Sequence, residues 1–145
     1  MWDDCGLLSI ERAGLSGYLD FRSARSAVAL PGLLSQGETL DLVYVDGSHL
    51  FEDVFVDAYF VTRMLSQNGV VAFDDSPDPH VQKVLRFLRS NCGDGLEELD
   101  LSPYRGDGGT SLRYRLARLL GKVQLTAFRR VGRVERAWNA AFHSF

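Results

Sequence analysis

Three aspartates are the residues of this sequence best suited to bind a cation. Asp46 follows the apolar run from Leu40 to Val45, and the pair Asp74 and Asp75 follows a second apolar run, from Val70 to Phe73. Carboxylates that lie close together repel one another unless protons or a cation compensate their charge. A divalent ion such as Mg²⁺ prefers carboxylate, water and substrate oxygens. We therefore predict that Asp46, Asp74 and Asp75 are metal ligands; the alternative is that they only form turns after the two runs.

A histidine follows the first of these aspartates in the same expected loop. His49 lies three residues beyond Asp46, so its imidazole would reach a substrate hydroxyl held near the carboxylates and accept its proton as a general base. A surface or helix-capping role for His49 is the alternative. His80 and His143 have weaker claims, because one falls in the first turn of an expected helix and the other in the C-terminal tail.

Two strands joined by a helix would position these side chains. The run from Leu40 to Val45 suits a strand that is buried on both faces. Apolar residues at helical spacing predict a helix from Glu52 to Leu65, which Asn68 and Gly69 would end. A right-handed crossover would set the run from Val70 to Phe73 parallel to the first strand. Both strands would then end at the edge where open parallel sheets bind ligands.

Strand-like and helical segments alternate along the rest of the chain, which predicts an α/β fold. One more helix has a well-marked start, with Asp78 as its N-cap and Pro79 at its first position. The remaining expected elements are strands at Tyr18 to Phe21, Leu96 to Leu101 and Val123 to Arg129, helices at Ala27 to Leu34, Ser111 to Leu120 and Val134 to Phe145, and a loop from Ser102 to Thr110.

Length and composition limit the class of protein. The chain has 145 residues, of which 46% are hydrophobic and 24% charged, as expected for one globular domain. Its net charge of −3 argues against a nucleic-acid partner and favours a small-molecule substrate. No apolar run approaches twenty residues, which predicts no membrane partner. Cys5 and Cys92 fit no metal-ligand spacing and come without a secretory leader, so we expect free thiols and a cytoplasmic location.

Two stretches of this chain resemble signatures of the small class I S-adenosylmethionine-dependent methyltransferases. Asp41 to His49 is similar to the pattern D-L-V-x-I-D-G-x-H, and Gly69 to Asp75 to the pattern G-G-x-x-x-x-D-D, with Glu52 and Asp57 on the helix between them. The resemblance covers Leu15 to Asn91 well and the remainder loosely; in that remainder, Gln124 to Arg130 is similar to the last strand of the family.

The resemblance implies a three-layer, Rossmann-like methyltransferase fold with S-adenosylmethionine as cofactor. The loop Ala24, Arg25 and Ser26 would be the counterpart of the segment that touches the adenine, and Asp46 and Gly47 would also line the cofactor site. In metal-dependent relatives such as catechol O-methyltransferase, the positions that match the three aspartates bind Mg²⁺. At the position of His49 that relative has a lysine, which serves as the catalytic base.

The first part of the family pattern has no counterpart in this sequence. Family members begin with a strand, a glycine-rich G-x-G-x-G loop and a second strand, and nothing before Gly6 matches them. Residues 1–145 are therefore expected to form a single partial methyltransferase domain, truncated at its N-terminus. The strand from Leu40 to Val45 would then have an open apolar edge. We expect self-association, completion by another chain, or a truncated reading frame.

Three classes of function remain open from the sequence. The first is O-methylation of a small molecule or sugar with the help of a divalent metal. The second is a non-catalytic, truncated remnant that acts as a binding or self-association module. The third is another α/β protein with clustered carboxylates and a metal, such as a phosphatase or a phosphoacceptor receiver domain; receivers, however, place the acidic pair on an earlier strand than the single aspartate.

Overall fold

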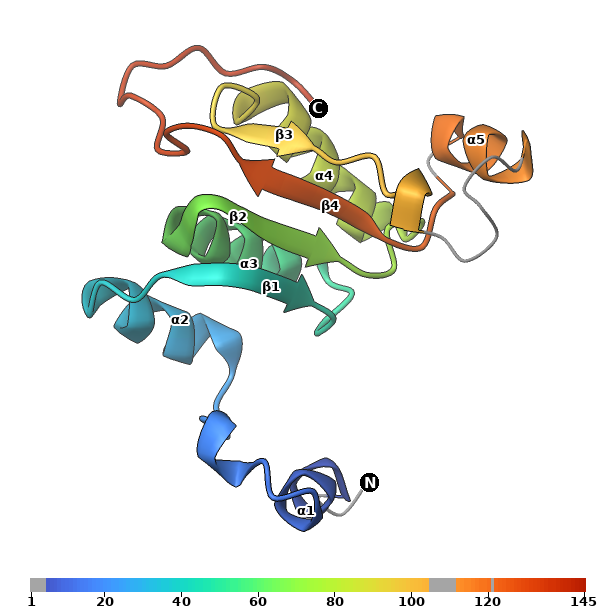
Figure 1. The fold of residues 1–145 in the computed structure, drawn as a ribbon. Coiled ribbons are helices and arrows are strands. Elements are labelled where there is room, and N and C mark those ends of the chain that lie inside the picture. The colour runs from blue at the N-terminus through green and yellow to red at the C-terminus, as the bar shows by residue number, and fades with distance from the viewer. Residues whose placement is uncertain (1–4, 105–111, 121) are drawn as a thin grey trace.

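A four-stranded sheet forms the centre of the protein in the computed structural model, which describes residues 5–104, 112–120 and 122–145 (Figure 1). The order of strands across the sheet is β1-β2-β4-β3. β1 and β2 run parallel, and β4 is antiparallel to both of its neighbours. The strands span Leu40–Val45 (β1), Leu65–Phe73 (β2), Leu96–Glu98 (β3) and Thr126–Arg130 (β4). This arrangement confirms the predicted α/β, Rossmann-like class.

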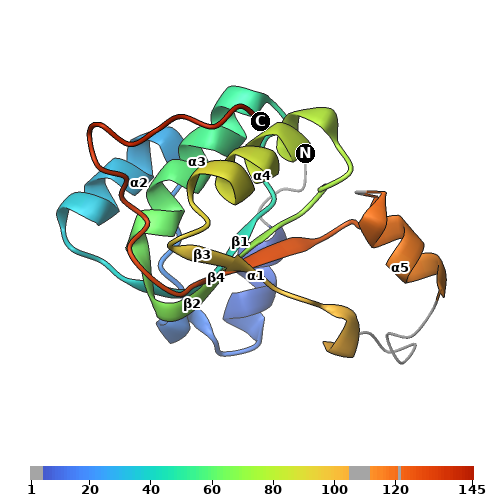
Figure 2. The same ribbon diagram turned by 90° about the horizontal axis from the view of Figure 1, so that it is seen from above.

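Three helices cover one face of the sheet, as the view from above shows (Figure 2). They are α2 (Ser26–Ser35), α3 (Phe51–Met64) and α4 (Pro79–Asn91). The first helix, α1 (Cys5–Arg12), lies beyond the β1 edge of the sheet and buries none of its residues. The other helical segments are α5 (Leu112–Leu119) and two 3₁₀ turns, Ser16–Tyr18 and Ser102–Tyr104. No helix in the described ranges is long and apolar enough to cross a membrane.

The crossover from β1 through α3 to β2 places the ends of both strands at one edge. α3 turns one apolar face to the sheet, with Val54, Ala58 and Val61 buried. β2 pairs with β1 so that Val45 lies opposite Phe73. The residues that follow these two partners therefore leave the sheet side by side, which confirms the predicted crossover and parallel pairing.

The core lies between the sheet and helices α3 and α4. Phe73 and Phe128, on β2 and β4, are 0% and 1% exposed, and their rings meet edge to face. The apolar face of α4 is buried in the same core, with Val81, Val84, Leu85 and Leu88 all at most 3% exposed. Asp78 caps this helix through a hydrogen bond from the His80 amide, 2.8 Å long.

Two of the predicted elements are wrong. Tyr18 to Phe21 is not a strand, because the 3₁₀ turn ends at Tyr18 and the chain then runs without a partner strand in the described sheet. Tyr18 is 90% exposed, so burial of its ring does not stabilise a strand at this position. Val134 to Phe145 forms no helix. Only Val134 of this segment is buried, and Trp138 is 97% exposed.

Other boundaries differ from the predicted ones by several residues. β2 begins at Leu65, ahead of the expected Val70, because Asn68 adopts φ 66° and the strand passes through this irregular position. β3 is shorter than predicted, and β4 covers the last four of its seven predicted residues and one residue beyond. The helix predicted from Ser111 is found as α5, while residues 105–110 of the predicted loop and Ser111 itself lie outside the described residues.

Candidate active site

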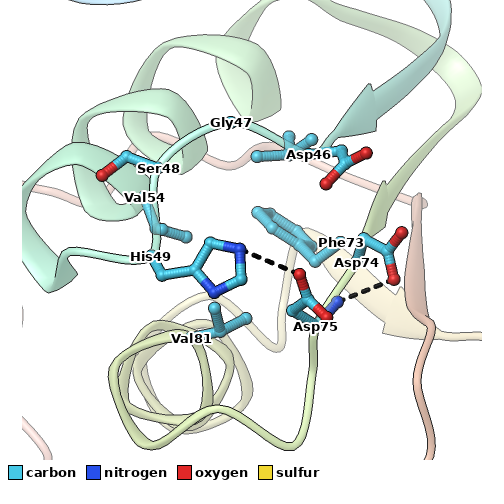
Figure 3. Close-up of a pocket in the computed structure, with 10 residues that line it drawn as sticks. Asp46, Gly47, Ser48, His49, Val54, Phe73, Asp74, Asp75 and Val81 are labelled. Atoms are coloured by element: carbon cyan, nitrogen blue, oxygen red, sulfur yellow. Dashed lines mark hydrogen bonds and ion pairs between the residues drawn. The ribbon is translucent and has the colours of Figure 1, made fainter.

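The loops after β1 and β2 bring the predicted site residues together at the carboxyl ends of these strands (Figure 3). Asp46 leaves β1 beside Asp74, whose amide donates a 3.0 Å hydrogen bond to the Val45 carbonyl and extends the pairing by one residue. His49 comes from the loop that leads into α3, and Asp75 from the turn that leads into α4. The expectation that a histidine would lie beside the carboxylates is thus met in the folded chain.

His49 lies between two carboxylates. Its Nε2 is 2.9 Å from Oδ2 of Asp75, and its Nδ1 is 4.0 Å from Oδ2 of Asp78. The imidazole is about half exposed, so a ligand from solvent can reach it. When one ring nitrogen of a histidine donates to a carboxylate, the other nitrogen carries the lone pair. General bases use this arrangement.

Asp75 holds an unusual backbone conformation. Its φ of 46° lies in the left-handed region, which aspartate tolerates better than most residues but which still costs about 1–3 kcal/mol. The Asp78 amide closes the turn with a 2.8 Å hydrogen bond to the Asp75 carbonyl. This backbone turns the Asp75 side chain toward His49, as Figure 3 shows. Strain of this kind is typical of functional turns.

Asp74 accepts hydrogen bonds from three groups. The phenol of Tyr44 donates to its Oδ2, while the Asp75 amide at 2.7 Å and the Gln124 amide at 2.9 Å donate to its Oδ1. These bonds, that of Tyr44 first, lower the pKa of Asp74 below its usual value. The same contact raises the pKa of Tyr44 to about 12.

Two members of this network were not predicted from the sequence. Tyr44 precedes Asp46 by two residues, so the alternation of β1 places both side chains on the same side of the strand. Gln124 lies just before β4, and its side chain donates to Oδ1 of Asp75 at 2.5 Å as well as to Asp74. The position of Tyr44 could have been read from strand alternation, whereas that of Gln124 depends on β4 pairing with β2.

The side chains as placed do not fit a divalent ion. All four carboxylate oxygens of Asp74 and Asp75 accept hydrogen bonds or form an ion pair, with Tyr44, the Asp75 amide, Gln124 and His49. Across residues 5–104, 112–120 and 122–145, no three His, Cys, Asp or Glu side chains are grouped to hold a metal. The metal ligands predicted from the sequence, Asp46 included, stay a prediction.

The bond from Tyr44 predicts a change in acid stability. Because the folded protein holds the Asp74 pKa low, this carboxylate stabilises the native state above its usual pKa, and the contribution is lost as pH falls through the lowered value. Tyr44→Phe should therefore lower the free energy of unfolding near neutral pH and flatten its decline below about pH 4. Urea unfolding between pH 3 and pH 7 measures both. Tyr18→Phe, on a 90% exposed ring, is the control, and identical curves for wild type and Tyr44→Phe would contradict the assignment.

A groove beside the carboxylates is large enough for a cofactor. It has a volume of about 660 Å³ and lies between the start of α2, the end of β1 and one side of α3. Four of the five predicted cofactor residues line it: Arg25, Ser26, Asp46 and Gly47. Ala24 is exposed and does not line it. A second, much smaller cavity of about 10 Å³ lies at His49, and both cavities share the wall from Val45 to Ser48.

This groove fits a bound adenosyl compound. Its volume lies in the usual range of small-molecule sites, roughly 300–1,000 Å³. Gly47 leaves the wall open, since the nearest atom to a β-carbon placed there is Oδ2 of Asp57 at 3.9 Å. Oδ1 of the same buried carboxyl group has no hydrogen-bond partner among the described residues, so it is available to a ligand donor.

Comparison with known families identifies the chain. A family model described as a methyltransferase domain matches residues 3–76, just over half of the 145 residues. The matched part contains α1 to β2 and ends directly after Asp74 and Asp75. No curated protein matches the sequence. The cofactor of this family is S-adenosylmethionine, and by family the chain is an S-adenosylmethionine-dependent enzyme. The chain belongs to the methyltransferase domain family.

Proposed function

We propose that this protein methylates a hydroxyl oxygen of a small molecule, such as a phenol or a sugar, with His49 as the general base. One observation carries the proposal: the His49–Asp75 pair and the cofactor-sized groove share the loop from Asp46 to Ser48. A hydroxyl group placed at His49 would therefore lie next to a methyl donor held in the groove. Proximity of this kind is the main contribution that such an enzyme makes to a direct displacement.

The residues of the groove would bind and orient the cofactor. Arg25 and Ser26, at the start of α2, line it together with the loop that holds Asp46 and Gly47. Asp46 and Asp53 make the rim acidic, which suits a cationic sulfonium compound. S-adenosylmethionine, when bound there, supplies an electrophilic methyl group.

His49 would remove the proton of the acceptor during transfer. With the Nε2 proton directed toward Oδ2 of Asp75, 2.9 Å away, Nδ1 carries the lone pair that accepts the proton. The methyl group would pass from a bound cofactor to the acceptor oxygen, and the electron pair of its former bond would remain on the cofactor sulfur. The imidazolium that forms has Nε2 2.9 Å from Oδ2 of Asp75 and Nδ1 4.0 Å from Oδ2 of Asp78, and the two negative charges stabilise it. This step uses His49 with the carboxylates of Asp75 and Asp78, and the Mg²⁺ site at Asp46, Asp74 and Asp75 stays a separate prediction.

Cofactor binding is the measurement that tests the proposal. We expect S-adenosylhomocysteine to bind the purified chain with micromolar affinity in a calorimetric titration, and Asp46→Ala to weaken binding because Asp46 lines the groove. Asp94→Ala, an exposed acid outside the groove, should leave the affinity unchanged. Repeating the titration with Mg²⁺ tests the predicted metal site. Absence of heat from a folded sample would contradict the enzymatic proposal.

Self-association is a second candidate function, supported by the edge of the sheet. β1 is an edge strand of the described sheet, and two of its apolar side chains, Leu42 and Tyr44, are 73% and 56% exposed. Open apolar edges are common sites of pairing with another chain. Sedimentation velocity should show a concentration-dependent dimer that Leu42→Lys weakens, if this function holds. A monomer at all concentrations would exclude it.

A further inference from the structure

Asp57 is a buried acid that the proposed chemistry does not use. It lies on α3, one turn after Asp53, and is only 9% exposed. The residue lines the groove beside β1. Its Oδ1 is the one buried side-chain nitrogen or oxygen in the described part of the chain that lacks a hydrogen-bond partner.

A carboxyl group in this position lacks the donors that it needs. Burial raises the pKa of Asp57, the hydroxyl of Ser26 offsets part of that rise by a hydrogen bond, and the charge of Asp53 adds to it. Buried polar groups are nearly always hydrogen-bonded, and an unpaired one destabilises the fold. A donor that enters the groove would meet this requirement. The Asp57 carboxyl can turn about its terminal torsion, which is broad, and so present either oxygen.

The walls of the groove limit what that donor can belong to. Leu30, Val43 and Val61, from α2, β1 and α3, line the same groove with apolar surface. Such walls suit a flat ring with polar atoms only at its edge. The charged side chains that line the groove are three aspartates and one arginine, so phosphate-bearing ligands are disfavoured.

We propose that Asp57 accepts a hydrogen bond from the exocyclic amine of a purine ring and thereby selects adenine over bases that carry an oxygen at that position. The inference rests on the proposed function, because it places the base of the cofactor in the same groove. It adds a role for a residue on α3, outside the Ala24 to Ser26 loop expected to touch the adenine. Ser26 is then a positioning residue, which holds one oxygen of Asp57 while the other receives the amine.

Nucleosides without the methionine part test this role directly. Adenosine carries the exocyclic amine. Inosine has an oxygen in its place, and N6,N6-dimethyladenosine has an amine without hydrogens. We expect the wild-type chain to bind adenosine about tenfold more tightly than either of the others, because a hydrogen bond to a charged group contributes about 1.5 kcal/mol or more. Asp57→Asn keeps the size of the side chain and can donate to the inosine oxygen, so it should lose the preference for adenosine. Asp53→Asn, in the same groove, should keep it.

The outcomes separate this inference from the proposed function. Equal affinity of the wild type for the three nucleosides, or binding of none of them by a folded sample, overturns the role of Asp57. A preference for adenosine that persists in Asp57→Asn also overturns it. If Asp57→Asn does not fold, the comparison of the three nucleosides on wild type still decides. A preference that depends on Asp57 without any methyl transfer would support this inference and contradict the proposed function. Binding of S-adenosylhomocysteine without a base preference would support the proposed function and contradict this inference.

Discussion

His49→Gln is expected to lower kcat for methyl transfer by about 10²–10⁴-fold, the usual contribution of a general base. The affinity for S-adenosylhomocysteine should stay within about twofold, because His49 lines the small cavity and not the cofactor groove. A loss in kcat without a loss in cofactor binding separates proton transfer from assembly of the site. The measurement is transfer of a labelled methyl group to a panel of small phenols and sugars, with calorimetry on the same samples.

A matched control is available in the C-terminal segment. His143 is exposed and contacts Asn91 only through its backbone atoms in the described structure. His143→Gln should therefore keep wild-type kcat and cofactor affinity. Full activity of His49→Gln would remove the histidine from the mechanism and leave the carboxylates as the only candidates for the base.

Phe73→Ala should cost about 3–5 kcal/mol of the free energy of unfolding, the usual range for a buried phenylalanine. The Phe73 ring is 0% exposed and meets Phe128 with ring centroids 6.3 Å apart, so its removal leaves a cavity between β2, β4 and the helices. Most domains have a free energy of unfolding of about 5–15 kcal/mol, so this loss would be about one third of the total. Urea unfolding followed by circular dichroism measures it.

Leu42→Ala provides the comparison on the neighbouring strand. Leu42 is 73% exposed, so its truncation should change the free energy of unfolding by no more than about 0.5 kcal/mol in the monomer. Equal losses for the two variants would mean that the sheet is not packed as described. A larger loss for Leu42→Ala at high protein concentration would instead indicate that another chain covers β1.

The central part of the fold could be predicted because apolar runs and helical spacing are strong local signals there. The expectation that β1 is buried on both faces is wrong, since Leu42 and Tyr44 are 73% and 56% exposed. The runs that became β1 and β2 are apolar over their last residues, and the helix between them buries Val54, Ala58 and Val61 at helical spacing. Right-handed crossover then fixes which aspartates meet. The G-V-V-A-F-D-D stretch did not reveal that its last residue would adopt a left-handed backbone, because φ at a turn depends on the helix that follows.

The remainder depended on contacts between distant segments. Gln124 reaches Asp74 and Asp75 only because β4 lies beside β2, and no pattern near Gln124 announces this contact. The tail from Val134 has helical spacing of apolar residues, but the chain instead packs Phe145 against Phe87 without forming a helix. Spacing alone was therefore misleading where tertiary contacts, and not a continuous buried face, decide the local conformation.

The unequal support of β1 and β2 has a consequence for motion at the site. β2 has a strand on each side, whereas β1 is hydrogen-bonded to a strand on one side only in the described sheet. Amide hydrogens of β1 should therefore exchange with solvent earlier than those of β2, through local opening that leaves the rest of the domain folded. Asp46 follows the strand that opens first, and Asp74 follows the strand that opens last. In the proposed reaction, such opening on the Asp46 side would let a bulky acceptor enter and its product leave.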